Sequence, residues 1–151
     1  MARFRYRMQN ILNVKQKLET QAKNEYAAAN VALLEEEEKL EKLKEHGVFL
    51  EDEGRRLVQQ DSLSIRDIDD NRRSIDINKE RIQQQKKAIK RAEQFLEEKR
   101  LAMVEIMKDV KTHEILRERA FEQFRREENA EESKQIDQLT SYQYGQRIKE
   151  G

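Results

Sequence analysis

The sequence predicts an all-α protein, a long antiparallel coiled-coil hairpin made of two helices. Charged residues make up 41% of its 151 residues and apolar residues only 36%, which leaves too little apolar volume for a thick globular core. Pro is absent and Gly occurs four times, so almost nothing interrupts a helix. An apolar seven-residue repeat is also present, which is typical of coiled coils and not of disordered chains.

The first helix is expected over about residues 3–59. Two successive four-residue steps around Ala22 predict a stutter, which locally unwinds a supercoil. The spacing continues through Gly47 and Gly54, although each glycine costs about 1 kcal/mol relative to alanine. The positions assigned to its seam are Phe4, Met8, Ile11, Lys15, Leu18, Ala22, Tyr26, Ala29, Leu33, Glu36, Leu40, Leu43, Gly47, Leu50, Gly54 and Leu57.

A break in this pattern at DSLSIRD, residues 61–67, predicts a turn over about residues 60–63. Ser64 is a favourable N-cap residue for the helix that follows. Asp67 lies three residues later, where its carboxylate can reach back in a variant of the capping box. The chain is therefore expected to reverse direction here.

The second helix is expected over about residues 64–140, before a frayed tail over residues 141–151, and the whole chain, residues 1–151, is expected to form one coiled-coil domain. A strict seven-residue repeat implies a left-handed supercoil against a partner helix. The repeated position is apolar in eight of nine cases: Ile68, Ile75, Ile82, Ile89, Leu96, Met103, Val110, Arg117 and Phe124.

The second seam position of this helix is predicted to be mixed, with charged side chains laying their aliphatic stems across the partner helix. Such a narrow, partly charged seam favours a monomer or a weak dimer over a robust oligomer. The residues assigned to it are Ile65, Arg72, Lys79, Lys86, Glu93, Arg100, Met107, Glu114 and Phe121.

Charge patterning predicts how the two helices pair. Residues 34–53 contain nine acidic and three basic side chains, whereas residues 72–91 contain eight basic and two acidic ones. If the chain reverses at residues 62–63, residue i faces residue 125 minus i, so these blocks oppose one another and Phe4 lies beside Phe121. Each exposed pair contributes only about 0.2 to 1 kcal/mol, so the charges select orientation and register in a hairpin about 90 Å long.

The residue inventory gives no basis for catalysis or metal binding. Cysteine is absent and the two histidines, His46 and His113, lie on different helices. The consecutive carboxylates of residues 35–38 point around a helix and do not converge on one ion. A two-helix hairpin also lacks a concave cavity, so we expect a protein without enzymatic activity, metal or cofactor.

No apolar run approaches the roughly 18 residues that span a bilayer, and the N-terminus lacks a secretory signal, so we expect a cytoplasmic protein. Because the first acidic residue is Glu19, a mitochondrial presequence and a membrane-surface role are alternatives for the opening segment. The basic clusters at residues 72–73 and 86–91 suggest nucleic acid. A net charge of zero and the absence of interleaved aromatic residues argue against that partner.

Three segments together resemble the FliJ family, the small coiled-coil component of the bacterial flagellar type III export apparatus. They are FRYRMQNILNVKQKLETQA at residues 4–22, LSIRDID at residues 63–69 and EQFRREENAEESKQIDQL at residues 122–139. The alternation of aromatic residues and arginine at the start is the most specific of them. The last resembles the family pattern K-x-x-D-E through Lys134 and Asp137, with Gln138 where glutamate is usual.

The resemblance implies a stalk similar to the central stalk subunit of rotary ATPases. It implies three partners, namely the hexameric flagellar export ATPase, the transmembrane export gate protein and export chaperones. It also implies a peripheral location on the cytoplasmic side of the cell membrane at the flagellar base. The homologous stalk of a virulence secretion injectisome, a structural coiled coil and an RNA-binding arm are the alternatives.

Two sets of residues are the predicted contact sites. Under the stalk interpretation, the end of the hairpin enters the ATPase ring through Arg3, Phe4, Arg5, Tyr6, Arg7, Phe121, Phe124, Arg125 and Arg126. The gate or chaperone surface is predicted from exposure, because a narrow seam cannot bury every apolar residue near the turn. Its residues are Val48, Phe49, Leu50, Leu57, Val58 and Ile77.

Overall fold

The computed structural model describes residues 2–150 and confirms the predicted all-α hairpin. Helix α1 (Gln9–Gln59) and helix α2 (Ile65–Glu150) pack against each other, and the described part of the chain contains no strand. None of the described helices is long and apolar enough to cross a membrane. The chain divides into two compact units, a tip unit of residues 20–104 and a terminal unit described over residues 2–19 and 105–150.

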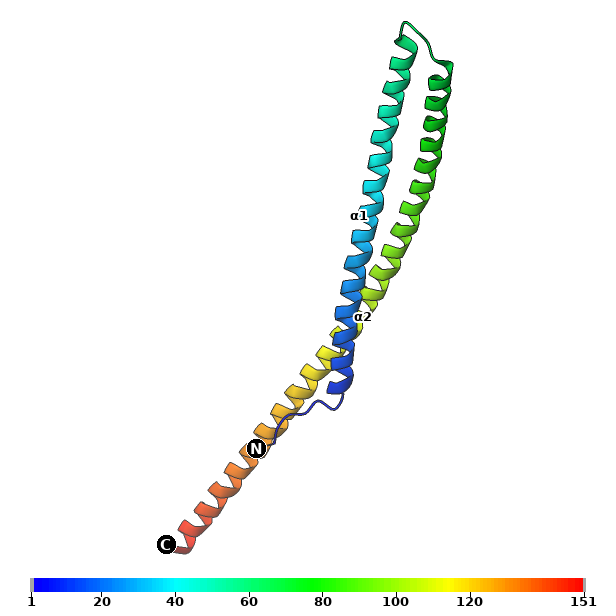
Figure 1. Cartoon of the computed structure of the whole chain (residues 1–151). Coiled ribbons are helices and arrows are strands. Elements are labelled where there is room, and N and C mark those ends of the chain that lie inside the picture. The colour runs from blue at the N-terminus through cyan, green and yellow to red at the C-terminus, as the bar shows by residue number, and fades with distance from the viewer. Residues whose placement is uncertain (1, 151) are drawn as a thin grey trace. The chain divides into compact units, whose positions relative to one another are not determined.

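The tip unit contains the turn and two stretches of helix that run side by side (Figure 1). Residues 60–62 form a bend after α1. Ser64 then caps α2, because its hydroxyl oxygen accepts a hydrogen bond of 3.3 Å from the Asp67 amide. Its carbonyl oxygen accepts a further bond of 3.1 Å from the Ile68 amide. The serine therefore begins α2 as its position in the sequence predicts.

The first apolar row of α2 is where the repeat predicts it, since every member except Arg117 is buried or half-buried. The predicted second row is wrong, because all nine of its residues, from Ile65 to Phe121, are exposed. The apolar residues at the two ends of that row favoured it, whereas the actual second row begins with three polar residues. The actual second row is Asn71, Asn78, Gln85, Ala92, Lys99, Ile106, His113 and Ala120.

The seam of α1 shows no stutter. From Leu12 onward its spacing alternates between three and four residues without interruption, and Glu19 occupies the position that was assigned to Leu18. Met8, Ile11 and Leu18 are exposed as a result. The seam residues are Leu12, Lys15, Glu19, Ala22, Tyr26, Ala29, Leu33, Glu36, Leu40, Leu43, Gly47, Leu50, Gly54 and Leu57.

Three side-chain amides on α2 form a ladder of hydrogen bonds to the backbone of α1 in the tip unit. Asn71 donates to the carbonyl oxygen of Leu50 at 2.9 Å, and Asn78 donates to that of Leu43 at 3.1 Å. Gln85 donates to the carbonyl oxygen of Glu36 at 2.8 Å. Donors and acceptors both recur every seven residues. This amide ladder, Asn71, Asn78 and Gln85, therefore fixes an antiparallel register in three consecutive layers.

Two glycines of α1 make room for the amide ladder. A Cβ atom on Gly47 would lie 2.9 Å from Nδ2 of Asn78, and one on Gly54 would lie 2.6 Å from Oδ1 of Asn71. Real Cβ atoms do not approach polar atoms so closely, so the helices can come this near only where a side chain is missing. The positions of both pairs add up to 125, the register that the charge pattern predicts.

The expected bounds of the helices differ from the structure at both ends of the chain. Residues 2–6 are not helical and α1 begins at Gln9, whereas α2 continues to Glu150 through the tail that was expected to fray. The alternation of aromatic residues and arginine explains the late start of α1. Side chains two residues apart share one side of an extended chain but lie on nearly opposite sides of a helix.

Candidate protein-interaction surface

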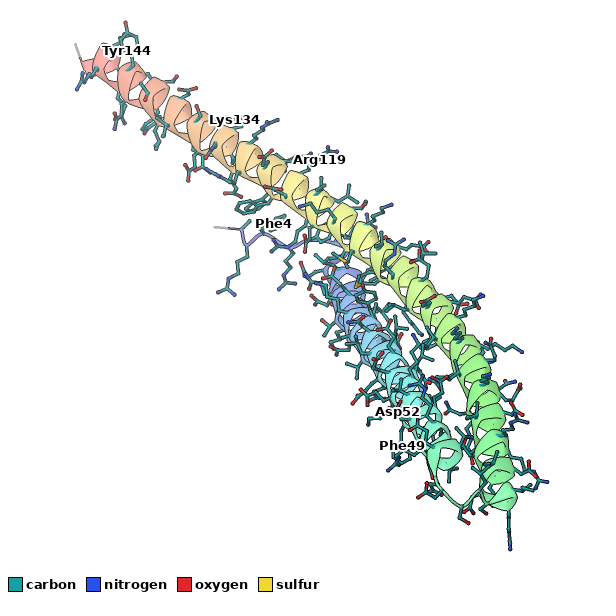
Figure 2. The ribbon with its side chains drawn as sticks, turned by 90° about the horizontal axis from the view of Figure 1, so that it is seen from above. Phe4, Phe49, Asp52, Arg119, Lys134 and Tyr144 are labelled. Carbon is teal, nitrogen blue, oxygen red and sulfur yellow. The ribbon has the colours of Figure 1, made fainter. Side chains whose placement is uncertain are left out.

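A segment outside the helices, which we call the strap, lies beside α2 in the terminal unit and comprises residues 3–7 (Figures 1 and 2). Phe4 and Tyr6 are half-buried, whereas Arg3, Arg5 and Arg7 are exposed. The aromatic side chains therefore hold the strap on the helix. The arginines point away from it and are available to a partner.

Aromatic contacts anchor the strap. The ring of Phe4 lies 5.1 Å from that of Phe121 in an edge-to-face arrangement and 5.6 Å from that of Phe124. Each such pair contributes about 0.5 to 1.5 kcal/mol beyond the area that it buries. The guanidinium of Arg117 lies 5.7 Å from the centre of the Phe4 ring and donates a hydrogen bond of 2.9 Å to Gln9. Arg117 thus joins the strap to the start of α1.

The hydroxyl group of Tyr6 is buried and has no hydrogen-bond partner among the described residues. A buried polar group without a partner costs about 1 to 3 kcal/mol. This cost offsets part of the stabilisation that the aromatic contacts of Phe4 provide.

The five arginines predicted to contact the ATPase are all exposed in the terminal unit. Arg125 and Arg126 line a surface hollow of about 250 Å³ together with Glu122 and Asn129. Among the described residues, none of the five takes part in an ion pair. Guanidinium groups without carboxylate partners are well suited to bind carboxylates of another protein. These arginines are Arg3, Arg5, Arg7, Arg125 and Arg126.

An ion pair between Lys15 and Asp109 joins the two helices of the terminal unit. The ammonium group of Lys15 lies 2.5 Å from the carboxylate of Asp109 and, as a hydrogen-bond donor, lowers the pKa of that carboxyl group. His113 lies one turn further along α2 in the seam, and its Nδ1 atom is buried without a partner among the described residues. His113 therefore belongs to the seam between the two helices.

The predicted gate or chaperone residues divide into two groups in the tip unit. Val48, Phe49, Val58 and Ile77 are exposed, with Phe49 at 55%. Leu50 is only 6% exposed and packs in the seam, and Leu57 is half-buried there. The exposure argument therefore fails for Leu50. The seam of α1 continues in alternating steps of three and four residues, and these steps place Leu50 between the two helices.

Sequence reasoning missed a row of exposed apolar residues near the end of α2. Ile136, Leu139 and Tyr142 recur every three residues and are between 62% and 65% exposed. Residues three apart lie on one face of a helix, so this row was visible as a periodic signal. The expectation of a frayed tail concealed it.

The family model described as "Flagellar FliJ protein" matches residues 4–149 of the chain. No curated protein and no solved structure matches it significantly. The match includes the strap except Arg3, the whole of α1, and α2 except Glu150. The chain therefore belongs to the FliJ family of flagellar proteins associated with protein export.

Proposed function

We propose that the protein is a non-enzymatic stalk of the flagellar type III export apparatus. In this role it binds the hexameric export ATPase, promotes assembly and activity of the ring, and links it to the transmembrane export gate and to export chaperones. It acts in the cytoplasm at the inner face of the cell membrane. Membership of the FliJ family and the antiparallel hairpin support this proposal.

The arrangement of the strap carries the ATPase part of the proposal. Phe4 packs on α2 and Tyr6 is half-buried, while Arg3, Arg5 and Arg7 remain exposed and without ion pairs among the described residues. Such a surface attracts acidic loops through charge and offers few deep apolar contacts. It can therefore bind a ring of subunits without being locked to one of them.

The test is the interaction with the cognate ATPase. Changing Arg3, Arg5 and Arg7 together to glutamate is expected to abolish capture of the ATPase and the increase in its hydrolysis rate. A matched control changes Arg66, Arg72 and Arg73 to glutamate, because these three are exposed arginines of the tip unit. Circular dichroism checks that both variants fold. Unchanged ATPase binding by the strap variant would refute this part of the proposal.

The exposed apolar residues of the tip unit support a second contact. Phe49 stacks on His46 at a ring distance of 6.1 Å and still exposes 55% of its surface beside Val48. Phe49→Asp is expected to weaken binding to the gate or to a chaperone, whereas Phe95→Asp, a similarly exposed position on α2, is the control. Equal binding by both variants and the wild type would count against a contact at Phe49.

A further inference from the structure

The last part of α2 has no partner helix within the chain. Every side chain of residues 129–149, which we call the free stretch, is exposed. The strap contacts α2 at Phe121 and Phe124, before this stretch begins. Lys134 and Tyr144 mark the free stretch in Figure 2, where no other segment of the terminal unit runs beside it.

The free stretch carries an apolar row that a second helix can cover. Leu139 is 62% exposed and Tyr142 is 65% exposed, and Ile136 lies on the same side of the helix. Most of the stability of helices in proteins comes from packing of one face, and the free stretch has no such packing within the described part of the chain. The Tyr142 hydroxyl accepts a hydrogen bond of 2.9 Å from Gln146, so burial of its ring would not leave the hydroxyl without a partner.

We propose that the free stretch pairs with the free stretch of a second copy of this chain in antiparallel orientation. A surface hollow of about 350 Å³ lined by Gln135, Gln138 and Leu139 lies beside the apolar row. In the register that we infer, Tyr142 of the second copy fills this hollow and contacts Leu139. The same contact occurs twice because the pair has a two-fold axis.

Charge selects this partner and this orientation. Glu131 and Glu132 lie near the start of the free stretch, and Arg147 and Lys149 lie near its end. An antiparallel pair places Glu132 of each copy opposite Lys149 of the other, whereas a parallel pair stacks glutamate on glutamate and lysine on lysine. The surface is therefore complementary to itself only when the two helices run in opposite directions.

The remaining layer of the pair joins Gln135 to Gln146 of the second copy. Because each contact occurs twice, four polar layers and two small apolar layers make a weak contact, so the dimer should form reversibly and depend on concentration. The inference does not rest on the proposed export function, because it uses only the exposure, spacing and charge of residues 129–149.

Sedimentation equilibrium of the full chain over a range of concentrations tests the pairing. The wild type is expected to show a monomer–dimer equilibrium. Glu132→Lys and Lys149→Glu should each weaken it at least about tenfold, because both salt bridges of the dimer become like-charge pairs. The double charge swap should restore it to within about twofold of the wild type. A monomer at every concentration, or a double variant as weak as the single ones, would overturn the proposal.

Matched controls separate pairing from net charge. Glu118→Lys changes an exposed residue of α2 outside the free stretch and should leave dimerisation unchanged. Glu118→Lys combined with Lys149→Glu should stay as weak as Lys149→Glu alone. Rescue by Glu118→Lys would show that total charge controls association and would contradict the inferred register.

Cross-linking tests the orientation, and the chain contains no cysteine of its own. A mixture of Glu132→Cys and Lys149→Cys chains of different size, oxidised together, should yield the mixed disulfide. In the antiparallel pair the two copies of residue 132 lie 17 positions apart along the helices, about 25 Å, so neither variant should cross-link alone. Cross-linking of each variant with itself, or no mixed product, would refute the antiparallel arrangement.

Discussion

Gln85 donates hydrogen bonds from one amide nitrogen to two oxygen atoms of Glu36, the backbone carbonyl at 2.8 Å and the carboxylate at 2.5 Å. The first bond belongs to the amide ladder, and its acceptor is a backbone atom of α1. The second lowers the pKa of the Glu36 carboxyl group. One residue therefore connects the register of the tip unit to its response to pH.

Acid is expected to weaken the hairpin through carboxylates that accept hydrogen bonds. The pKa of Glu36 is lowered by Gln85 and then by Lys39, and the pKa of Glu25 is lowered chiefly by its hydrogen bond from Lys99. A carboxyl group whose pKa is lower in the folded chain stabilises the fold fully at neutral pH, and this contribution is lost as pH falls through the lowered value. Melting temperature, followed by circular dichroism, should therefore decrease below about pH 4.5.

Glu36→Gln supplies the control for this pH dependence. The variant cannot titrate at this position, so its melting temperature should change less between neutral pH and about pH 3 than that of the wild type. Identical pH profiles for the two proteins would show that Glu36 does not link protonation to folding.

Replacement of two glycines by alanine should have opposite effects. Alanine favours a helix over glycine by about 0.5 to 1 kcal/mol. At Gly145 the added Cβ atom meets nothing within 4 Å, so Gly145→Ala should stabilise α2 by up to that amount. At Gly54 the added Cβ atom would lie 2.6 Å from Oδ1 of Asn71. The Asn71 side chain is buried, and its amide nitrogen donates a hydrogen bond to the carbonyl oxygen of Leu50.

Gly54→Ala should therefore displace Asn71 and lower the free energy of unfolding by about 1 to 3 kcal/mol, since a buried amide loses its hydrogen bond. Urea denaturation of both variants measures the difference. A stabilising effect of Gly54→Ala would show that Asn71 can move aside without cost.

Phe4→Ala should release the strap. The loss of the ring contacts with Phe121 and Phe124 removes about 1 to 3 kcal/mol of packing, since each aromatic pair contributes about half that amount. Trypsin cleaves after arginine, so cleavage after Arg5 and Arg7 should become several-fold faster as the strap opens. Phe95→Ala changes an exposed aromatic residue of the tip unit and is the control. Equal cleavage rates for the wild type and Phe4→Ala would mean that Phe4 does not hold the strap.

Leu50 and Phe49 are adjacent but should respond differently to aspartate. Leu50 is 6% exposed and Phe49 is 55% exposed. Leu50→Asp buries a charge without a partner and should reduce the free energy of unfolding by about 3 kcal/mol or more, whereas Phe49→Asp should change it by about 0.5 kcal/mol or less. Thermal denaturation distinguishes these outcomes. A large loss of stability in Phe49→Asp would make it unsuitable as a test of gate binding.

The first apolar row of α2 could be predicted because Ile68, Ile75, Ile82 and Ile89 repeat every seven residues without exception. The antiparallel orientation and the register near 125 also followed from charge, as the contact of Phe4 with Phe121 shows. These features depend on repeats of apolar residues and on blocks of like charge, and both can be recognised in the sequence alone.

The second row could not be found from residue type. Asn71, Asn78 and Gln85 are polar and would normally be assigned to a solvated face, yet their amides bind backbone atoms of the other helix. In the same way Glu19 displaces Leu18 from the seam of α1 because the phase of the whole helix decides which residue is half-buried. Which residues lie in the seam depends on the helix that packs against them, and the sequence of one helix does not contain this information.

The strap shows the same limit at short range. The sequence predicts a continuous helix over the alternation from Arg3 to Arg7, whereas the structure has no helix there. The period of two between Phe4 and Tyr6 agrees with an extended chain, and Phe121 and Phe124 supply the surface that holds it there.

The acceptors of the amide ladder are main-chain atoms, and this makes the two helices unequally tolerant of mutation. Any amino acid at position 36, 43 or 50 supplies the same carbonyl oxygen, so substitution of the side chain there leaves the acceptor in place. In contrast, the hydrogen bonds need the side-chain amides of Asn71 and Asn78, and the close approach needs glycine at positions 54 and 47. Sequence drift should therefore be constrained at donors and glycines while the residues that accept these bonds remain freer to vary.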